Sequence, residues 1–523
     1  MASAKSGSSA QIKDGGSQGS VGVSDKPLGF LDETLRNGQQ SLWATRMKTS
    51  SMLPIAPVMG EAGYSEVCAM AGVSFETSAM YLYEDPWQRM RLLHQLMPQT
   101  RLDGLVRARN LWGWKSQPYD VQELFLKTLL RNGMDSIKVF DGLNDYRNLE
   151  WLVGKAKSLG FKVKGLVGFA LTPAHTDEYL ARKAKELMDL KVDALVFTDS
   201  AGLMYPERCR TVVRAIREVI GEIEMHFHSH TITGLANDCY REAIRGGVDV
   251  VWTAARPLAY GKAVPWTLDI LRMAEELGRK TSLSEDKIRE IDDWFYWVAY
   301  QEGKPIAEEV QYDPAFYQQY AGHQIPGGMF SNMVKQLQDL KIEHRLSEVL
   351  EETARVRAEL GHPHMVTPFS QFVGVQAVLN VMEGKRYVKV PEEVRLYARG
   401  YYGQPIHPLD PNVQDQLIAG MPLLDSLEGL DEPILPKIRA EQGPFESDED
   451  LLLFLFLNPN AYNNFRKFKE PITWNPVRSP LVSLINELSK QDEITSFHFS
   501  RGGLKLDLTA GNDDRKKVGM SES

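Results

Sequence analysis

The chain has 523 residues, of which 43% are hydrophobic and 25% are charged, a composition typical of folded globular proteins and unlike fibrous, disulfide-stapled or disordered ones. Its formal net charge of -9 argues against nucleic acid or an anionic membrane as the main partner. The three cysteines lie far apart in the sequence, which is typical of a reducing compartment, and the longest apolar run, at 451–457, is too short to span a bilayer. We therefore expect a cytoplasmic protein with no membrane insertion.

The amino-terminal segment 1–26 is rich in Ser and Gly and lacks an apolar stretch, so we expect a disordered tail. Beyond it, short β-rich runs alternate with amphipathic helical segments up to about residue 280. The eight expected strands are 28–34, 64–70, 102–108, 135–141, 162–170, 193–199, 223–229 and 249–255. Strands buried on both faces and each followed by a helix are typical of a closed parallel barrel. We predict an α/β fold with a (β/α)8 TIM barrel over 27–280; a doubly wound open sheet is the less favoured alternative, because no G-x-G-x-x-G follows the first strand.

Polar side chains lie at or just past the ends of several expected strands. In such a barrel the active site forms at these carboxyl ends, because side chains there point into the mouth built by the loops. Each residue by itself has a structural alternative, such as a helix cap, and for Asp199 we favour that alternative. Together they indicate a site: Asp32, Arg107, Asp141, Asp199, His228 and His230.

The second half of the chain has a different pattern. Helical periodicity interrupted by Pro and Gly covers 281–460, which predicts a mostly α-helical domain that completes the active-site funnel. A Pro- and Asn-rich stretch at 461–480 indicates a linker. Residues 481–512 are expected to form a small α+β element, a helix followed by a two-stranded hairpin, and 513–523 a second disordered tail.

Ordered motifs along the chain resemble those of one family. They are LDETLRNGQQSLWATRMKT (31–49), YEDPWQRMRLL (83–93), VRARNLWGW (106–114), VFDGLNDYRNLE (139–150), DSAGLMYPE (199–207), HSHTITG (228–234), HQIPGGMFSNM (323–333) and VTPFSQFVG (366–374). Over about residues 27–430 the sequence resembles the carboxyltransferase domain of biotin-dependent enzymes such as pyruvate carboxylase, oxaloacetate decarboxylase and transcarboxylase. The resemblance implies that CO₂ moves between carboxybiotin and a small carbonyl-containing acceptor, a pyruvate-like keto acid or a ketone, through an enolate.

In that family a divalent metal such as Zn, Mn or Co polarises the keto oxygen, held by two His, an Asp and a carbamylated Lys. His228 and His230 match the His pair, and their alternation on a strand places both rings on one face. Asn37 stands where the family has the Asp and Thr198 where it has the Lys, so both anionic ligands are replaced by neutral groups. A neutral donor set binds a divalent ion more weakly, which leaves the presence of a metal open.

The resemblance also implies residues that contact the substrate. Arg107 matches the arginine that binds the keto-acid carboxylate, Gln40 a polar residue near the substrate, and Asp141 a motif at the barrel mouth. Arg36 matches the arginine beside the missing metal ligand. Lys262 stands where the family has a proton-shuttling Thr; pointing inward, it would supply a cation, base or nucleophile, and the alternative is a solvent-exposed side chain.

The sequence shows no biotinylation motif and no biotin carboxylase segment, so we expect biotin on a separate biotin carboxyl carrier protein and a biotin carboxylase subunit as a second partner. The element at 481–512 weakly resembles part of a carrier subunit, and it is either a docking element or a hairpin packed on its own chain. The family commonly forms dimers. Three hypotheses follow: a carboxyltransferase subunit of a multi-subunit complex, which we favour; a catalytically silent scaffold of such a complex; or a biotin-independent lyase or aldolase that uses Lys262.

Overall fold

The computed structural model describes residues 26–476, 484, 488, 496–501, 504–509 and 517–520. Apart from Lys26, the amino-terminal tail expected at 1–26 lies outside the described residues. The same holds for the helix expected at the start of 481–512, of which only residues 484 and 488 are described.

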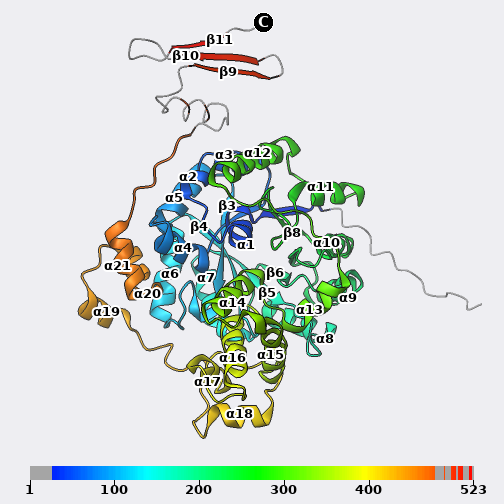
Figure 1. The fold of residues 1–523 in the computed structure, drawn as a ribbon, viewed down its shortest axis with the longest axis vertical. Helices are drawn as coiled ribbons and strands as arrows, with labels where there is room; N and C mark the ends of the chain where they lie inside the picture. Colours follow the sequence, from blue (N-terminus) through cyan, green and yellow to red (C-terminus); the bar gives the residue numbers. More distant parts are fainter. Residues whose placement is uncertain are drawn as a thin grey trace, which may run out of the picture.

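Eight parallel strands close into a barrel, in which β1 pairs with both β2 and β8. Figure 1 shows the strands surrounded by helices, with α14 to α18 gathered beside the barrel. All eight strands predicted from the sequence are confirmed, and so is the TIM barrel. They are β1 (Gly29–Asp32), β2 (Glu66–Ala71), β3 (Arg101–Arg107), β4 (Met134–Phe140), β5 (Lys162–Gly168), β6 (Ala194–Asp199), β7 (Glu224–Ser229) and β8 (Val250–Thr253).

Helices and short turns of helix connect the barrel strands. Their starts follow simple capping chemistry: the Thr176 side chain accepts a hydrogen bond from the Tyr179 amide at the start of α8, and Pro206 occupies the first turn of α9. The helical segments are η1 (Thr34–Gly38), α1 (Gln39–Leu42), α2 (Thr49–Met52), α3 (Ala56–Glu61), α4 (Gly72–Tyr81), α5 (Pro86–Leu96), η2 (Ala108–Asn110), α6 (Tyr119–Arg131), η3 (Tyr146–Leu149), α7 (Glu150–Ser158), α8 (Asp177–Asp189), α9 (Pro206–Ile220), α10 (Ala236–Arg245) and α11 (Thr267–Glu276).

The rest of the chain up to residue 468 is helical, as predicted. The elements are α12 (Glu285–Glu302), α13 (Pro314–His323), α14 (Gly327–Asp339), η4 (Glu343–Arg345), α15 (Leu346–Glu359), α16 (Phe369–Glu383), α17 (Glu392–Ala398), α18 (Pro411–Ile418), α19 (Leu435–Gln442), α20 (Asp448–Phe456) and α21 (Pro459–Phe468). A separate apolar core forms from residues within 325–417 together with Leu143 of the loop after β4, whereas α12, α20 and α21 pack into the core of the barrel. The limits of the two apolar cores therefore differ from the predicted domain boundaries at 280 and 460, because three helices beyond residue 280 share the core of the barrel.

The linker expected at 461–480 is wrong for its first residues. Helix α21 begins with Asn458, whose side chain accepts a hydrogen bond of 2.9 Å from the Ala461 amide, and with Pro459 in its first turn. Tyr462 and Phe465 are buried against the barrel. An Asn-Pro pair thus starts a packed helix here, although the local composition is typical of a loop.

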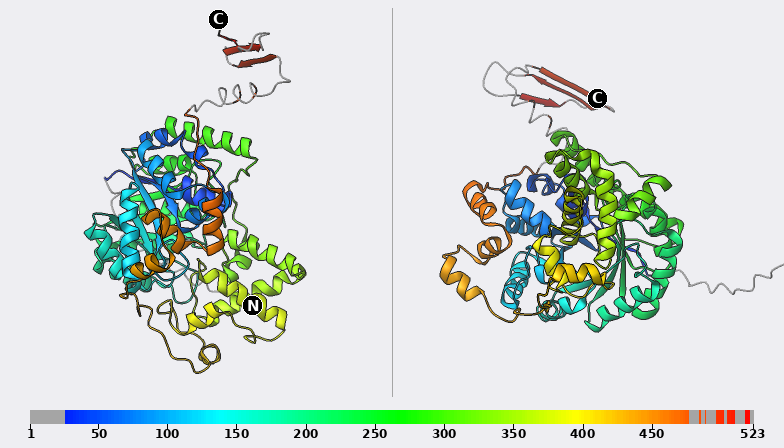
Figure 2. Two further views of the ribbon diagram at one scale, coloured as in Figure 1. Left: turned by 90° about the vertical axis from the view of Figure 1, so that its left-hand side faces the viewer. Right: turned by 60° about the horizontal axis from the view of Figure 1, so that its bottom comes forward.

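The predicted hairpin near the carboxyl end is confirmed: β9 (Ser496–Arg501) and β10 (Leu504–Thr509) pair antiparallel. A third strand, β11 (Lys517–Met520), pairs with β10, so the disordered tail expected at 513–523 is wrong for these four residues. Figure 2 shows the three strands standing apart from the barrel. None of the helices in the described part of the chain is long and apolar enough to cross a membrane.

Candidate active site

The turn that follows β1 carries two of the predicted site residues, Arg36 and Asn37. Asp32 ends β1 and fixes this turn, because its carboxylate accepts hydrogen bonds of 3.0 Å from the Thr34 amide and 2.7 Å from the Thr34 hydroxyl. Burial raises the pKa of Asp32 to about 7. Asp32 therefore positions the turn that presents Arg36 and Asn37.

The histidine pair lies at the end of β7, as predicted. The rings of His228 and His230 have centroids 5.0 Å apart. The Asn37 Nδ2 atom lies 2.9 Å from Nε2 of His230, and the Thr198 hydroxyl lies 2.6 Å from Nδ1 of His228. The structure thus brings together all four residues that the sequence places at the ligand positions of the family.

His228 is buried and His230 is partly buried, and both imidazoles are neutral at neutral pH. Burial, with the positive charge of Arg36, lowers the pKa of His230 to about 4, and it lowers the pKa of His228 well below its usual range. The Nε2 atom of His228 is buried and has no hydrogen-bond partner in the described part of the molecule.

The cluster does not fit the metal site that the resemblance implies. Its four side chains are an amide, a hydroxyl and two neutral imidazoles, and the cation of Arg36 acts on both rings. In the described ranges no group of three or more His, Cys, Asp or Glu side chains is arranged to hold a metal. A divalent ion would bring two positive charges to a set of donors that are all neutral.

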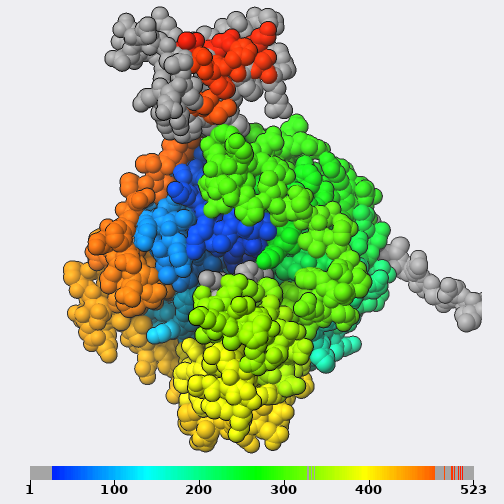
Figure 3. Space-filling model, in the orientation of Figure 1, coloured from blue at the N-terminus to red at the C-terminus, as the bar shows by residue number. Residues whose placement is uncertain are grey.

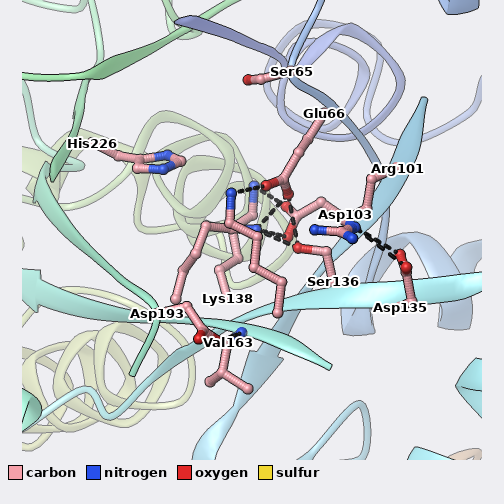
Figure 4. A network of polar contacts seen from close by, with 12 residues as sticks. Ser65, Glu66, Arg101, Asp103, Asp135, Ser136, Lys138, Val163, Asp193 and His226 are labelled. Atoms are coloured by element: carbon pink, nitrogen blue, oxygen red, sulfur yellow. Dashed lines mark hydrogen bonds and ion pairs between the residues drawn. The ribbon is translucent and has the colours of Figure 1, made fainter. Parts of the chain in front are cut away.

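A buried network of ion pairs lies inside the barrel, and it was not predicted from the sequence. Arg36 pairs with Glu33 at 2.8 Å, Glu33 with Lys138, and Lys138 with Asp103 at 2.8 Å. Figure 4 shows how Glu66, Asp103, Ser136 and Lys138 converge. Further in, Lys164 pairs with Asp103 at 2.9 Å and with Glu66 at 2.5 Å.

This network keeps Glu33 ionised and paired with Arg36, the cation beside the histidine cluster. Although burial by itself raises the pKa of Glu33, Arg36 and Lys138 outweigh that effect and hold the pKa below its usual range. The sequence signal for the network was present in two predicted strands, where Lys138 and Lys164 each stand beside apolar residues.

Arg107 and Asp141 line a small, partly open pocket at the barrel mouth. Residues between α15 and α18 form part of its wall, so the helical region does contribute to this mouth. Figure 3 shows one face of the molecule, hollowed where the blue barrel segments meet the green helical region. The lining residues are Arg107, Ala108, Arg109, Asn110, Trp114, Phe140, Asp141, Gly142, Thr367, Pro368, Phe369 and Tyr402.

The guanidinium of Arg107 donates hydrogen bonds to backbone carbonyl groups, and it has a charge interaction with Glu76. Its Nη2 donates hydrogen bonds to the carbonyl oxygens of Trp112 (3.3 Å) and Gly113 (2.9 Å), and its Nε is buried with no partner in the described residues. Burial lowers the pKa of Arg107 to about 10. A cation in this state favours an anionic or carbonyl ligand.

Asp141 is buried, and burial raises its pKa to about 6. It accepts hydrogen bonds from the Leu143 amide (2.8 Å) and the Asn148 side chain (3.0 Å), which hold the loop after β4. Asp199 has the structural role favoured above, since its carboxylate accepts a 2.8 Å hydrogen bond from the Met204 amide.

Arg36 and two further predicted site residues, Gln40 and Lys262, lie outside this pocket. Gln40 is half-buried in α1, and Lys262 is exposed in the loop between β8 and α11. The loop that carries Lys262 is tied to the histidine strand, because the Thr231 amide donates to the Ala263 carbonyl at 2.9 Å and the Thr231 hydroxyl to the Gly261 carbonyl at 3.1 Å. The histidine cluster is likewise absent from the pocket lining.

A closed parallel barrel whose carboxyl end holds a buried arginine, a carboxylate and a histidine pair has the architecture of the barrel enzymes, whose active sites lie at that end. A family model described as a conserved carboxylase domain matches residues 321–505. A pyruvate carboxylase subunit of Methanothermobacter thermautotrophicus is 36% identical over 491 residues, which is 92% of this chain and 84% of that protein.

Two further relatives support the same assignment. The methylmalonyl-CoA carboxyltransferase 5S subunit of Propionibacterium freudenreichii subsp. shermanii is 34% identical, over 74% of this chain and 76% of that protein. A variant carboxyl transferase domain of Rhizobium etli pyruvate carboxylase, solved with pyruvate, superposes with a TM-score of 0.77 and 25% identity, over 92% of this chain and 84% of that one. The chain belongs to the carboxyltransferase family of biotin-dependent carboxylases, and the resemblance found in the sequence is confirmed.

Proposed function

We propose that this chain transfers a carboxyl group between carboxybiotin on a separate carrier protein and a small keto acid or ketone, and that Arg107 binds the acceptor. The observation that carries the proposal is the state of Arg107, which lines the mouth pocket and is hydrogen-bonded only to neutral carbonyl groups. The positive charge of this guanidinium, which also interacts with Glu76, suits an anionic carboxylate or an enolate oxygen.

The transfer balances without any oxidant or reductant. A C–H bond beside the acceptor carbonyl breaks, the new C–C bond to the carboxyl group forms, the N–C bond of carboxybiotin breaks, and the proton ends on the biotin nitrogen. Arg107 supplies positive charge to the enolate at the pocket, whereas Arg36, held by the Glu33 carboxylate at 2.8 Å, supplies positive charge beside the histidine cluster. The proposed chemistry needs no resident divalent ion, in agreement with the neutral donors around the two histidines.

Lys262 and Gln40 remain candidates for a supporting role. The Lys262 side chain is exposed, but its loop is hydrogen-bonded to the residue that follows His230. We therefore keep the proposed role of Lys262 in proton transfer and of Gln40 in substrate binding as predictions.

The proposed partners are a biotin carboxyl carrier protein and a biotin carboxylase subunit. Two of the relatives are each named as one subunit of a pyruvate carboxylase, which implies a multi-subunit enzyme. Cys68, Cys209 and Cys239 are all free thiols, which supports a cytoplasmic complex. The proposal includes a homodimer and a docking role for the hairpin β9–β10.

The test is to purify the chain with its biotinylated partners and to assay the set against a panel of keto acids and ketones, with and without avidin. The proposal expects carboxylation that avidin abolishes and that Arg107→Met reduces. Unchanged activity of the complex in Arg107→Met and His228→Ala would instead show a scaffold. Turnover that avidin does not affect, with borohydride trapping of substrate on Lys262, would show a lyase or aldolase.

A further inference from the structure

An extended segment crosses the rim of the barrel mouth between two helices. Residues 303–313, which we call the strap, follow α12 and precede α13, and they form neither helix nor strand. Asp313 ends the strap as the cap of α13, where its side chain accepts a 2.8 Å hydrogen bond from the Ala315 amide. A helix thus fixes the strap at each end, while most of its residues are exposed.

The strap contacts four connections of the mouth in the order in which their strands lie around the barrel. In the closed sheet β1 is followed by β8, β7 and β6. Near the start of the strap, the Pro305 carbonyl accepts a 2.9 Å hydrogen bond from the indole of Trp43, which lies in the connection after β1. Further along, the Glu308 carbonyl accepts a 3.2 Å hydrogen bond from the Gly261 amide, in the loop after β8.

The second half of the strap lies on the connections after β7 and β6. The Glu309 carboxylate accepts a 3.1 Å hydrogen bond from the Asn237 side chain, and the hydroxyl groups of Tyr312 and Tyr205 lie 2.9 Å apart. In the loop after β7, a Cβ atom on Gly234 would lie 2.5 Å from the amide nitrogen of Tyr312. The absence of a side chain at Gly234 therefore lets the strap backbone lie directly on the loop that follows the histidine strand.

The strands and connections that the strap spans also carry the histidine cluster and the Lys262 loop. Their contributions are Asn37 after β1, Lys262 after β8, His230 after β7 and Thr198 in β6. The acceptor pocket is built on other connections, since Arg107 ends β3 and Asp141 follows β4. The hydrogen bonds of the strap described above therefore all go to the side of the mouth that holds the histidines.

We propose that the strap is a positioning element for the transfer step, because by joining the four connections it holds Asn37, His230 and the Lys262 loop at fixed distances from one another. This inference rests on the proposed function and makes Trp43 a positioning residue. Acceptor binding at Arg107 is separate from the strap. Loss of a strap contact therefore lowers kcat and leaves the KM for the acceptor unchanged, since a small displacement of the groups at a reaction centre slows the chemical step strongly.

A matched pair of substitutions tests this role. Trp43→Phe removes the indole N–H that bonds to Pro305 in the strap, and Trp294→Phe removes an equivalent 2.8 Å bond from a buried Trp on α12 to the Ser51 carbonyl. We expect Trp43→Phe to lower kcat of the avidin-sensitive transfer about tenfold with an unchanged KM, and Trp294→Phe to leave both constants unchanged. A role in stability alone would change both variants alike, so equal kcat values in the two would overturn the inference.

A reversible cross-link tests whether the strap stays in place during turnover. A Cβ atom on Gly261 would lie 3.3 Å from the Cβ atom of Ala307, close to the separation of about 3.5–4.5 Å that a disulfide spans. We expect the double variant Gly261→Cys, Ala307→Cys to have the same kcat in its oxidised and reduced forms, with the wild-type chain treated alike as the control. Loss of activity on oxidation that a reductant reverses would show a lid that has to open, and would overturn the inference.

Hydrogen exchange separates a failure of this inference from a failure of the proposed function. The Gly261 amide, which donates to the Glu308 carbonyl, should exchange faster in Trp43→Phe than in Trp294→Phe, and this comparison needs no turnover. Equal exchange in the two variants would overturn the positioning role of the strap by itself. The absence of avidin-sensitive transfer in the wild-type complex would instead overturn the proposed function.

Discussion

The side-chain amide of Asn37 lies 2.9 Å from Nε2 of His230, at the position where the resemblance to the carboxyltransferase family implies a carboxylate and a metal. An amide can hydrogen-bond to a neutral imidazole without a counter-ion, and Thr198 does the same for His228 at 2.6 Å. Each neutral replacement thus hydrogen-bonds to one of the two imidazoles. Both rings therefore have a hydrogen-bond partner that is not a metal.

Restoring one anion should change the metal content. In Asn37→Asp a carboxylate faces His230, and two imidazoles with one carboxylate form a ligand set that divalent ions favour. We expect the wild-type protein to bind well below one equivalent of Zn²⁺, Mn²⁺ or Co²⁺ after dialysis, and Asn37→Asp to bind more tightly. Elemental analysis and titration calorimetry measure this difference. A full equivalent of tightly bound metal in the wild-type protein would contradict the account, and Asn37→Ala serves as the control without a new charge.

Removing the charge of Arg107 should reduce the activity strongly. A hydrogen bond to a charged group contributes about 1.5–3 kcal/mol, so Arg107→Met should lower kcat/KM for a keto acid by roughly one to two orders of magnitude. Arg107→Lys should recover part of this loss, because it restores the charge and not the planar geometry. Steady-state assays of the reconstituted complex measure both, and equal kcat/KM in wild type and Arg107→Met would refute the role of Arg107.

Acceptor binding should become stronger as the pH falls through about 6. Burial raises the pKa of Asp141 to about 6, so this carboxylate is ionised at pH 7.5 and mostly protonated at pH 5. Its negative charge opposes an anionic acceptor in the same pocket, and protonation removes that repulsion. The dissociation constant for a keto acid should therefore fall severalfold between pH 7.5 and 5.5, and Asp141→Asn should remove this dependence. A pH dependence of the same size in Asp141→Asn would assign it to another group.

The buried ion network should be important for stability. Lys138→Met leaves Glu33 and Asp103 without their shared partner in the barrel interior, and breaking such a pair costs about 3–5 kcal/mol of unfolding free energy. Lys127→Met is the matched control, because Lys127 pairs with Glu123 on the surface at 2.8 Å and its loss should cost less than about 1 kcal/mol. Denaturant titrations followed by circular dichroism compare the two. If the two variants lose the same stability, the network does not support the barrel in this way.

The fold was predictable because the barrel repeats one pattern. All eight strands followed from short β-rich runs placed before amphipathic helices, and strands such as β6 are buried along their whole length. Helix α21 was not predicted, since its start at Asn458 and Pro459 has the composition of a linker, and only the burial of Tyr462 and Phe465 distinguishes it.

The site was predictable only in part. The neighbouring positions of His228 on β7 and His230 just past its end followed from their spacing, and Arg107 followed from the end of its strand. The partners of Lys138 come from different strands or loops, so no local spacing could show that the lysine is buried and paired. The pocket at the barrel mouth joins Trp114 to Phe369, residues far apart in the sequence. It exists only after the helical region has packed on the barrel.

The most direct test of the central claim is the transfer half-reaction with a carrier protein that has been carboxylated beforehand. The chain is freed of divalent ions by chelation, mixed with the carboxylated carrier and a keto acid, and the labelled carboxyl group on the acceptor is counted. We predict that transfer persists in the metal-free chain and is lost in Arg107→Met. Transfer that disappears on chelation and returns when Zn²⁺, Mn²⁺ or Co²⁺ is added would contradict the account.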